Sequence, residues 1–317
     1  MDRVPRFQLR LDRGHWHPAG ERTLDRACGS LACGRHTKPV KYKLLALDLD
    51  GTLLDPYGKL THAVREAVAS ARRRGLEVVL CTGRRYRTTL PLLSELGLEG
   101  CVVVNNGALV KQIATGRTLH SHFLQPDLYP DALGFLRPQG PPLLYVDTYE
   151  QGFDVLTDAI GDAHEYQLEY LDDHSEHIRQ VKDLASERRN DVIMLSTMGD
   201  VETLTQLRAE ARKRFGERIG THLIQNKNYR GHILELFSPH SGKWAGLTFV
   251  AQQLGIEATE IAAIGDDWND EEILRRAGLG IAMGNAVFEV QAAADQVVRS
   301  NAEGGAAEAI ERVLLAL

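Results

Sequence analysis

Asp48 and Asp50 stand one residue apart, directly after the apolar run 44–47 and before Gly51. A short, continuous apolar run is typical of a strand in a parallel sheet that is covered on both faces. Because side chains alternate along an extended chain, both carboxylates can point to one side at the strand's carboxyl end, where open α/β sheets bind ligands. Two converging carboxylates repel each other unless a cation or a shared proton intervenes. The pair therefore indicates a magnesium site with one carboxylate left to attack a substrate, although Asp and Gly also form ordinary turns after strands.

Three further segments place polar residues next to predicted elements. Thr82 and Gly83 follow a second apolar run, the segment 265–270 (GDDWND) follows a third, and Lys243 opens a predicted helix. One such motif is weak evidence, but the four motifs in this order and in these contexts form a specific signal. On these residues the sequence resembles the haloacid dehalogenase-like phosphatase superfamily, and within it the Cof-like (type IIB) sugar phosphatase branch. The resemblance covers residues 41–317.

The resemblance implies three catalytic residues, Asp48, Asp50 and Lys243. Asp48 would be the nucleophile and would also bind Mg²⁺ through its second oxygen. Asp50 would protonate the leaving alcohol and then activate water, while its main-chain carbonyl binds the metal. Lys243 would bring positive charge to the phosphoryl group. Asp266 would bind Mg²⁺ directly, since this hard cation prefers oxygen ligands.

The residues that the resemblance assigns to phosphate or substrate binding are Leu49, Thr82, Gly83, Lys243 and Asn269. It further implies that Asp270 orients the metal shell or Lys243, and that Asn106 lies near the cleft; Arg84 is a further candidate for substrate contact. Each of these three has a plainer interpretation: an acidic helix N-terminus, a tight turn and a solvated arginine. Arg230 and His232 are polar candidates for substrate contact in the middle of the chain, where polar residues are more often simply on the surface.

Helix and strand patterns alternate from Lys41 onward. Thr61 is a good N-cap for a helix that ends near Gly75, and the strand 101–104 runs into the turn signal Asn105-Asn106-Gly107. Such alternation predicts a parallel sheet with right-handed crossovers. The expected elements are helices at 61–75, 85–96, 241–254, 269–277 and 306–317, and strands at 44–47, 77–81, 101–104, 260–264 and 280–282.

The middle of the chain has a different character. Helical stretches mix there with β-rich pieces, the segment 137–142 (RPQGPP) interrupts the pattern, and no catalytic motif occurs. We interpret residues 123–237 as an inserted α+β cap that determines substrate specificity. The predicted fold class is α/β, with a Rossmann-like, doubly wound parallel sheet as the catalytic core at 41–122 and 238–317. Residues 1–40 are expected to be a disordered N-terminal extension.

Composition narrows the possible functions. The chain has 317 residues, 43% hydrophobic and 25% charged, with a formal net charge of −6, which is typical of a globular protein of about two domains. Nothing in this balance indicates a nucleic-acid surface, and no apolar run approaches the ~18 residues of a membrane helix. Cys81 and Cys101 fall in apolar runs and are expected to be buried free thiols. Cys28 and Cys33 lack a second pair at zinc-site spacing, so a reducing cytoplasm is the simplest location.

These inferences predict a Mg²⁺-dependent phosphatase. Its partners would be small phosphorylated metabolites, foremost sugar phosphates, hydrolysed through an aspartyl-phosphate intermediate. Asp50 argues against a haloacid dehalogenase, and a β-phosphoglucomutase would carry its cap between the first two motifs. Two alternatives stay open: phosphomannomutase-like phosphoryl transfer, and a non-catalytic binding protein on the same fold. The cap contains no motif that identifies the substrate.

Overall fold

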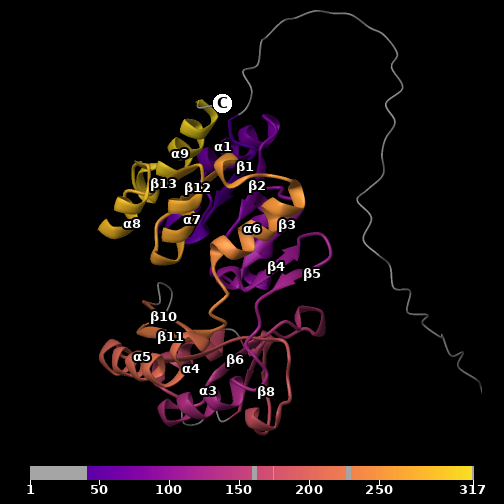
Figure 1. Ribbon diagram of the computed structural model, residues 1–317, viewed down its shortest axis with the longest axis vertical. Coiled ribbons are helices and arrows are strands. Elements are labelled where there is room, and N and C mark those ends of the chain that lie inside the picture. The colour runs from indigo at the N-terminus through magenta and orange to yellow at the C-terminus, as the bar shows by residue number, and fades with distance from the viewer. Residues whose placement is uncertain (1–40, 159–162, 174, 226–229, 316–317) are drawn as a thin grey trace, which may run out of the picture. The chain divides into compact units, whose positions relative to one another are not determined.

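The Asp48 segment follows a strand inside a five-stranded parallel sheet (Figure 1). A computed structural model of the protein describes residues 41–158, 163–173, 175–225 and 230–315, so the extension predicted at 1–40, with Cys28 and Cys33, lies outside the described residues. Every pairing in the sheet is parallel. Its strands, in spatial order, are β14 (Gln296–Val297), β13 (Leu279–Ala282), β12 (Ile261–Gly265), β1 (Leu44–Leu47) and β2 (Glu77–Leu80).

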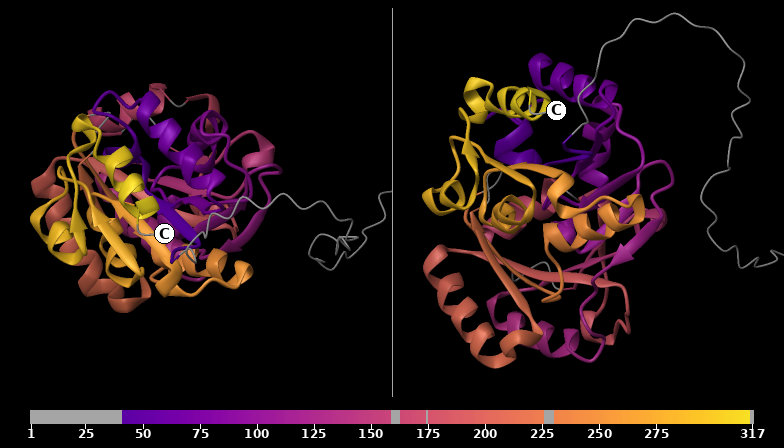
Figure 2. Two further views of the ribbon diagram at one scale, coloured as in Figure 1. Left: turned by 90° about the horizontal axis from the view of Figure 1, so that it is seen from above. Right: turned by 45° about the horizontal axis from the view of Figure 1, so that its top comes forward.

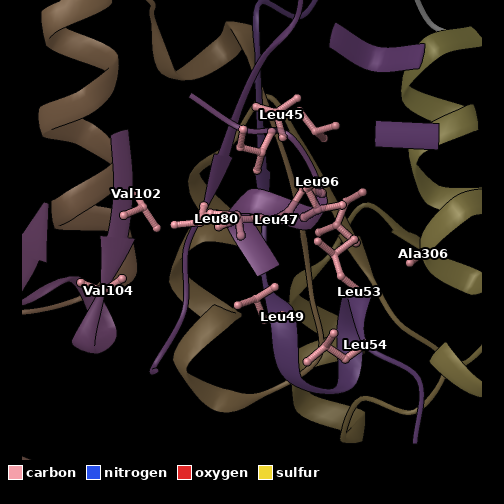
Figure 3. Packing of buried hydrophobic residues seen from close by; sticks show 14 of the residues in the cluster. Leu45, Leu47, Leu49, Leu53, Leu54, Leu80, Leu96, Val102, Val104 and Ala306 are labelled. Atoms are coloured by element: carbon pink, nitrogen blue, oxygen red, sulfur yellow. The ribbon is translucent and has the colours of Figure 1, made fainter. Parts of the chain in front are cut away.

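Helices cover both faces of this sheet, because alternate residues of β1 pack into two different apolar layers. Leu45 and Leu47 join a cluster that includes residues of α1 (His62–Arg73) and α9 (Gly305–Leu315), part of which Figure 3 shows. Leu44 and Ala46 join a second cluster with α6 (Lys243–Leu254) and α7 (Glu271–Arg276). The C-terminal α9 lies beside α1, as the right-hand view of Figure 2 shows. The predicted doubly wound core is confirmed.

The third predicted strand differs from expectation. β3 (Cys101–Val104) does not extend the parallel sheet by a full ladder: only an isolated bridge, Cys81 to Val103, joins it to the chain after β2. Instead it forms an antiparallel sheet with β4 (Leu109–Gln112) and β5 (Thr118–Ser121). The turn after β3 explains the reversal. Asn105, Asn106 and Gly107 all have left-handed φ values, of 50°, 53° and 81°, which turn the chain back on itself at once.

The inserted segment forms a six-stranded sheet with helices packed against it, which confirms the predicted α+β cap. Its strands, in spatial order, are β10 (Gly220–Gln225), β11 (His232–Phe237), β9 (Val192–Gly199), β6 (Leu143–Val146), β7 (Val155–Thr157) and β8 (Ile178–Gln180). All pairings are antiparallel except that of β7 with β8. Leu234 and Leu236 of β11 pack in one apolar cluster with residues of α3 (Tyr129–Leu136) and α5 (Val201–Phe215). A further helix, α4 (Glu165–Asp173), contacts β9.

Most predicted element ends agree with the structure to within two residues. Thr61 caps α1 by accepting a hydrogen bond from the N–H of Val64 at 3.3 Å, and α2 (Tyr86–Glu95) ends just before Gly97. The helix predicted at 269–277 is split into a 3-10 turn and α7, and a short helix that was not predicted, α8 (Phe288–Ala293), follows β13. Cys81 is a buried free thiol as predicted, whereas Cys101, at the start of β3, is only half-buried. Within the described ranges, no helix is both long enough and apolar enough to cross a membrane.

Candidate active site

Asp48, Lys243 and Asp270 form a buried chain of ion pairs. The Nζ of Lys243 donates to Oδ1 of Asp48 at 2.6 Å and to Oδ1 of Asp270 at 2.7 Å. None of the three side chains is more than 5% exposed. Separate elements supply them: Asp48 follows β1, Lys243 is the first residue of α6, and Asp270 immediately precedes α7. The strand ends and the helix start thus bring together residues that lie up to 222 positions apart, since 270 − 48 = 222.

Burial and charge act in opposite directions on this chain. Burial tends to lower the pKa of Lys243, but the carboxylates of Asp270 and Asp48 offset it and raise the pKa above its ordinary value, so the lysine stays charged. Burial raises the pKa of Asp48 well above the usual range, the charge of Lys243 opposes this rise, and Asp270 and Asp266 add to it. The ionised form of Asp48 is therefore energetically unfavourable unless further positive charge lies nearby.

Asp266 completes a group of three acidic side chains. Carboxylate oxygens of Asp48, Asp266 and Asp270 all lie within 4.8 Å of one another. Three buried carboxylates beside a single lysine leave an excess of negative charge, which a hard divalent cation with oxygen ligands relieves. The donor set therefore fits Mg²⁺.

The three carboxylates are not equivalent as ligands. Oδ1 of Asp270 receives Lys243, and its Oδ2 accepts the main-chain N–H groups of Asp266 and Asp267, both at 3.2 Å. Asp270 therefore contacts both Lys243 and the preceding loop, and its role in orienting Lys243 stays a prediction. Asp48 and Asp266 are the carboxylates best suited to the metal.

Asp266 is held by groups that the sequence did not single out. Its Oδ1 accepts the hydroxyl of Thr52 at 2.9 Å, and its Oδ2 accepts the side-chain N–H of Asn285 at 3.2 Å. The same Asn285 amide donates to the carbonyl of Gly51 at 2.8 Å. Gly51 has a φ of +86°, and a Cβ there would lie 2.1 Å from Oδ2 of Asp266. Glycine is thus required at this position both by the backbone conformation and by the close approach of the aspartate.

We expect Gly51→Ala to displace Asp266 and to lower activity by roughly 100-fold, because small misplacements in a catalytic site cost about that much. Gly58→Ala is the matched control: Gly58 lies in the same connection with a φ of +73°, but nothing lies within 4 Å of a Cβ there. Both variants should lose about 1–2 kcal/mol of unfolding free energy through left-handed strain. Steady-state rates and urea denaturation check this. Equal activity losses in the two variants would contradict a specific role of the Gly51–Asp266 approach.

Asp50 lies outside the group of three carboxylates, because Arg84 engages it. The guanidinium donates through Nε to Oδ2 of Asp50 at 2.7 Å and through Nη2 to Oδ1 at 2.6 Å. This hydrogen-bonded pairing raises the pKa of Arg84. The fork fixes the direction of the Asp50 carboxylate. Arg84, for which a solvated position was the plain alternative, is therefore an orienting partner of the predicted acid–base residue.

Thr82 and Gly83, two of the phosphate-binding candidates, line a cavity of about 240 Å³ together with Asp48, Asp50 and Arg84. Asn106 and Asn269 line it as well, and the side-chain N–H of Asn269 donates to Oδ1 of Asn106 at 2.8 Å.

Leu49 differs from the other phosphate-binding candidates. Its side chain is fully buried in the apolar cluster of β1. Only its main-chain groups therefore remain for a ligand.

The two cap candidates occupy different places. His232 lines a neighbouring cavity of about 780 Å³. Arg230 is exposed and pairs with Glu169 and Glu165 of α4, and the described residues that line the Asp48 cavity do not include it. Sequence reasoning missed Glu235, which does line that cavity. The available signal was a single charged residue inside the otherwise apolar run 233–237.

Comparisons with known proteins agree with this arrangement. A sequence model of haloacid dehalogenase-like hydrolases matches residues 45–310. The chain belongs to this family. Its prediction as a haloacid dehalogenase-like hydrolase is thereby confirmed.

Individual relatives match over nearly their whole length. Phosphatase YwpJ of Bacillus subtilis is 29% identical over 290 residues, which cover 86% of this chain and 100% of the relative. The 5-amino-6-(5-phospho-D-ribitylamino)uracil phosphatase YwtE of the same organism is 28% identical over 296 residues, covering 86% of this chain and 98% of YwtE. A crystal structure of a haloacid dehalogenase-like hydrolase from Bacteroides thetaiotaomicron superposes with a TM-score of 0.73 at 28% identity, covering 86% of this chain and 100% of that one.

Proposed function

We propose that this hydrolase is a Mg²⁺-dependent phosphatase of small phosphate esters, foremost sugar phosphates, with Asp48 as the nucleophile. The observation that carries the proposal is the buried Asp48–Lys243–Asp270 chain at the wall of a small cavity, with Asp266 beside it. A buried carboxylate that accepts a hydrogen bond from one lysine is suited to attack phosphorus once further positive charge nearby favours its ionised form.

The reaction divides between two carboxylates. An oxygen of Asp48 attacks the phosphorus while the bond from phosphorus to the leaving oxygen breaks, and Asp50 gives its proton to that oxygen. Asp50, now a carboxylate, then takes a proton from water, whose oxygen attacks phosphorus and breaks the bond to Asp48. Arg84 orients the Asp50 carboxylate through two hydrogen bonds, at 2.7 and 2.6 Å.

Other residues balance the charge of the phosphoryl group. Lys243 carries the positive charge nearest to Asp48, and Thr82, Gly83 and Asn269 line the cavity with groups that can donate to phosphoryl oxygens. Asp48, Asp266 and the main-chain carbonyl of Asp50 would hold Mg²⁺, which neutralises charge on the phosphoryl oxygens when bound.

The relatives favour small polar esters. YwtE, by its name, acts on a phosphorylated ribityl compound. The free thiols of Cys81 and Cys101 support the proposal of a cytoplasmic enzyme.

Asp266→Asn should raise the Mg²⁺ concentration needed for half-maximal activity on p-nitrophenyl phosphate by ten- to a hundredfold, the loss typical when metal ligation is perturbed. The amide keeps an acceptor for Thr52 but loses the one that Asn285 uses, so the change removes a charge and one hydrogen bond. Asp267→Asn is the matched control, because Asn caps the following turn as well as Asp does, and its curve should stay close to that of the wild type. Calorimetric titration with Mg²⁺ gives the same comparison without turnover. Unchanged affinity in Asp266→Asn would show that the metal binds elsewhere.

A further inference from the structure

Glu235 of the cap lines the same cavity as Asp48 and Asp50, although it lies 185 positions after Asp50 in the sequence, since 235 − 50 = 185. Its place follows from strand alternation. Leu234 and Leu236 are fully buried in the cap's apolar cluster, so Ile233 and Glu235 face the other side of β11. Ile233 lines the cavity too, and so does Ile224, its partner on β10.

The carboxylate of Glu235 is buried without a matching donor. The residue is 7% exposed, and among the described residues Oε2 finds no hydrogen-bond partner. Its cross-strand partner is His222, whose Nδ1 lies 3.6 Å from Oε2. That separation exceeds the usual N–H···O range of about 2.7–3.2 Å. A buried acceptor left unpaired costs free energy, which a ligand that brings a donor recovers.

The position of the reacting groups determines which end of a substrate meets Glu235. The proposed nucleophile Asp48 and the proposed acid–base residue Asp50 line the core side of the cavity, so the phosphoryl group must lie on that side to react, and the cap carboxylate repels it. Glu235 therefore faces the leaving group. The other cap residues at the cavity are Ile224, Gln225 and Ile233, two apolar side chains and an amide, which suit the carbon skeleton and the hydroxyl groups of a sugar or sugar alcohol.

We propose that Glu235 is a specificity-determining residue that accepts hydrogen bonds from hydroxyl groups of a polyhydroxylated leaving group. This inference rests on the proposed phosphatase function and names its substrate class. Substrate recognition would then lie on β11 and on the neighbouring strand β10. Arg230 would instead stabilise the cap by pairing with Glu169.

The test compares Glu235→Leu and Glu235→Gln with the wild type on four probes: glucose 6-phosphate, ribose 5-phosphate, phosphoethanolamine and acetyl phosphate. Removal of a hydrogen bond to a charged group should lower kcat/KM for the two sugar phosphates by roughly ten- to a hundredfold, with a smaller loss for Gln, which keeps an acceptor. Acetyl phosphate, which has no hydroxyl on its leaving group, should be almost unaffected. Glu169→Gln, an exposed cap carboxylate that pairs with Arg230, should leave all four unchanged.

Two further readouts separate the possible outcomes. If Glu235 binds substrate, Glu235→Leu should melt at the same temperature as the wild type or higher, because a buried oxygen without a hydrogen-bond partner is removed. A lower melting temperature with equal losses on all probes would overturn the proposal in favour of a structural pair with His222. A selective loss on phosphoethanolamine would overturn it in favour of an ammonium site.

Calorimetric binding of glucose 6-phosphate to the non-turnover Asp48→Asn protein, with and without Glu235→Leu, tests the inference even if the wild type hydrolyses none of the esters. Weaker binding then supports the inference while the phosphatase function fails, and unchanged binding overturns the inference.

Discussion

Asp48→Asn should reduce phosphatase turnover by about 10³-fold or more, the loss expected when a covalent nucleophile is removed. The amide has nearly the same shape as the carboxylate, and its oxygen can still accept the hydrogen bond that Lys243 donates at 2.6 Å. It is nonetheless a very poor nucleophile. The fold should therefore persist while the chemistry is lost. Single-turnover kinetics with p-nitrophenyl phosphate, together with a thermal melt, measure both quantities.

The control for this variant is Asp55→Asn. Asp55 lies in the same connection after β1 and accepts the main-chain N–H groups of Tyr57 and Lys59, both at 2.9 Å, and asparagine supports the same kind of turn. Its rate should match that of the wild type. Near-normal turnover in purified Asp48→Asn would contradict the assignment of the nucleophile.

Lys243→Ala should lower both the unfolding free energy and the rate of phosphatase turnover. It leaves the buried carboxylates of Asp48 and Asp270 without their common cation, and breaking a buried ion pair from one side costs about 3–5 kcal/mol. Loss of the positive charge beside the phosphoryl group should also reduce turnover by roughly 10²–10³-fold. Urea unfolding in the presence of EDTA measures the loss of unfolding free energy, because EDTA prevents a metal ion from compensating for the missing charge.

Lys43→Ala is the matched comparison. Lys43 makes an ion pair with Glu260 at 2.6 Å, the same separation as between Lys243 and Asp48, but the two side chains are 53% and 26% exposed. Exposed pairs contribute about 0–1 kcal/mol, so this variant should remain nearly as stable as the wild type. Similar losses of unfolding free energy in the two variants would show that burial does not determine how much Lys243 contributes to stability.

The parts of the protein that the sequence predicts best are those coded locally. The apolar run of β1, the adjacent Asp48, and the N-cap Thr61 each depend on a few neighbouring residues, and each stands in the structure where its pattern indicates. The same holds for Lys243 at the first position of α6. Because strand ends of a parallel sheet meet at one edge, locating the strands also brings Asp48 and Asp266 together.

The features that were missed depend on register and on side-chain direction across distant elements. Glu235 faces the cavity only because Leu234 and Leu236 pack on the opposite side, and this needs the pairing of β11 with β10. The Arg84–Asp50 fork likewise joins two motifs through side-chain rotamers that spacing does not reveal. The antiparallel pairing of β3 follows from the left-handed conformations at Asn105 and Asn106, which the turn signal indicated without showing the partner strand.

The central claim is that the phosphoryl group passes through Asp48. Acid quenching of the enzyme during turnover of p-nitrophenyl phosphate, followed by peptide mapping with mass spectrometry, tests this directly. The leaving group of this ester needs no proton, so Asp50→Asn should still form the intermediate, which should accumulate because the base that activates water is absent. We predict the added mass of one phosphoryl group on the peptide that contains Asp48, confined to that side chain and absent from Asp48→Asn. A phosphoryl group on another residue, or steady turnover with no phosphorylated enzyme in either protein, would contradict the mechanism.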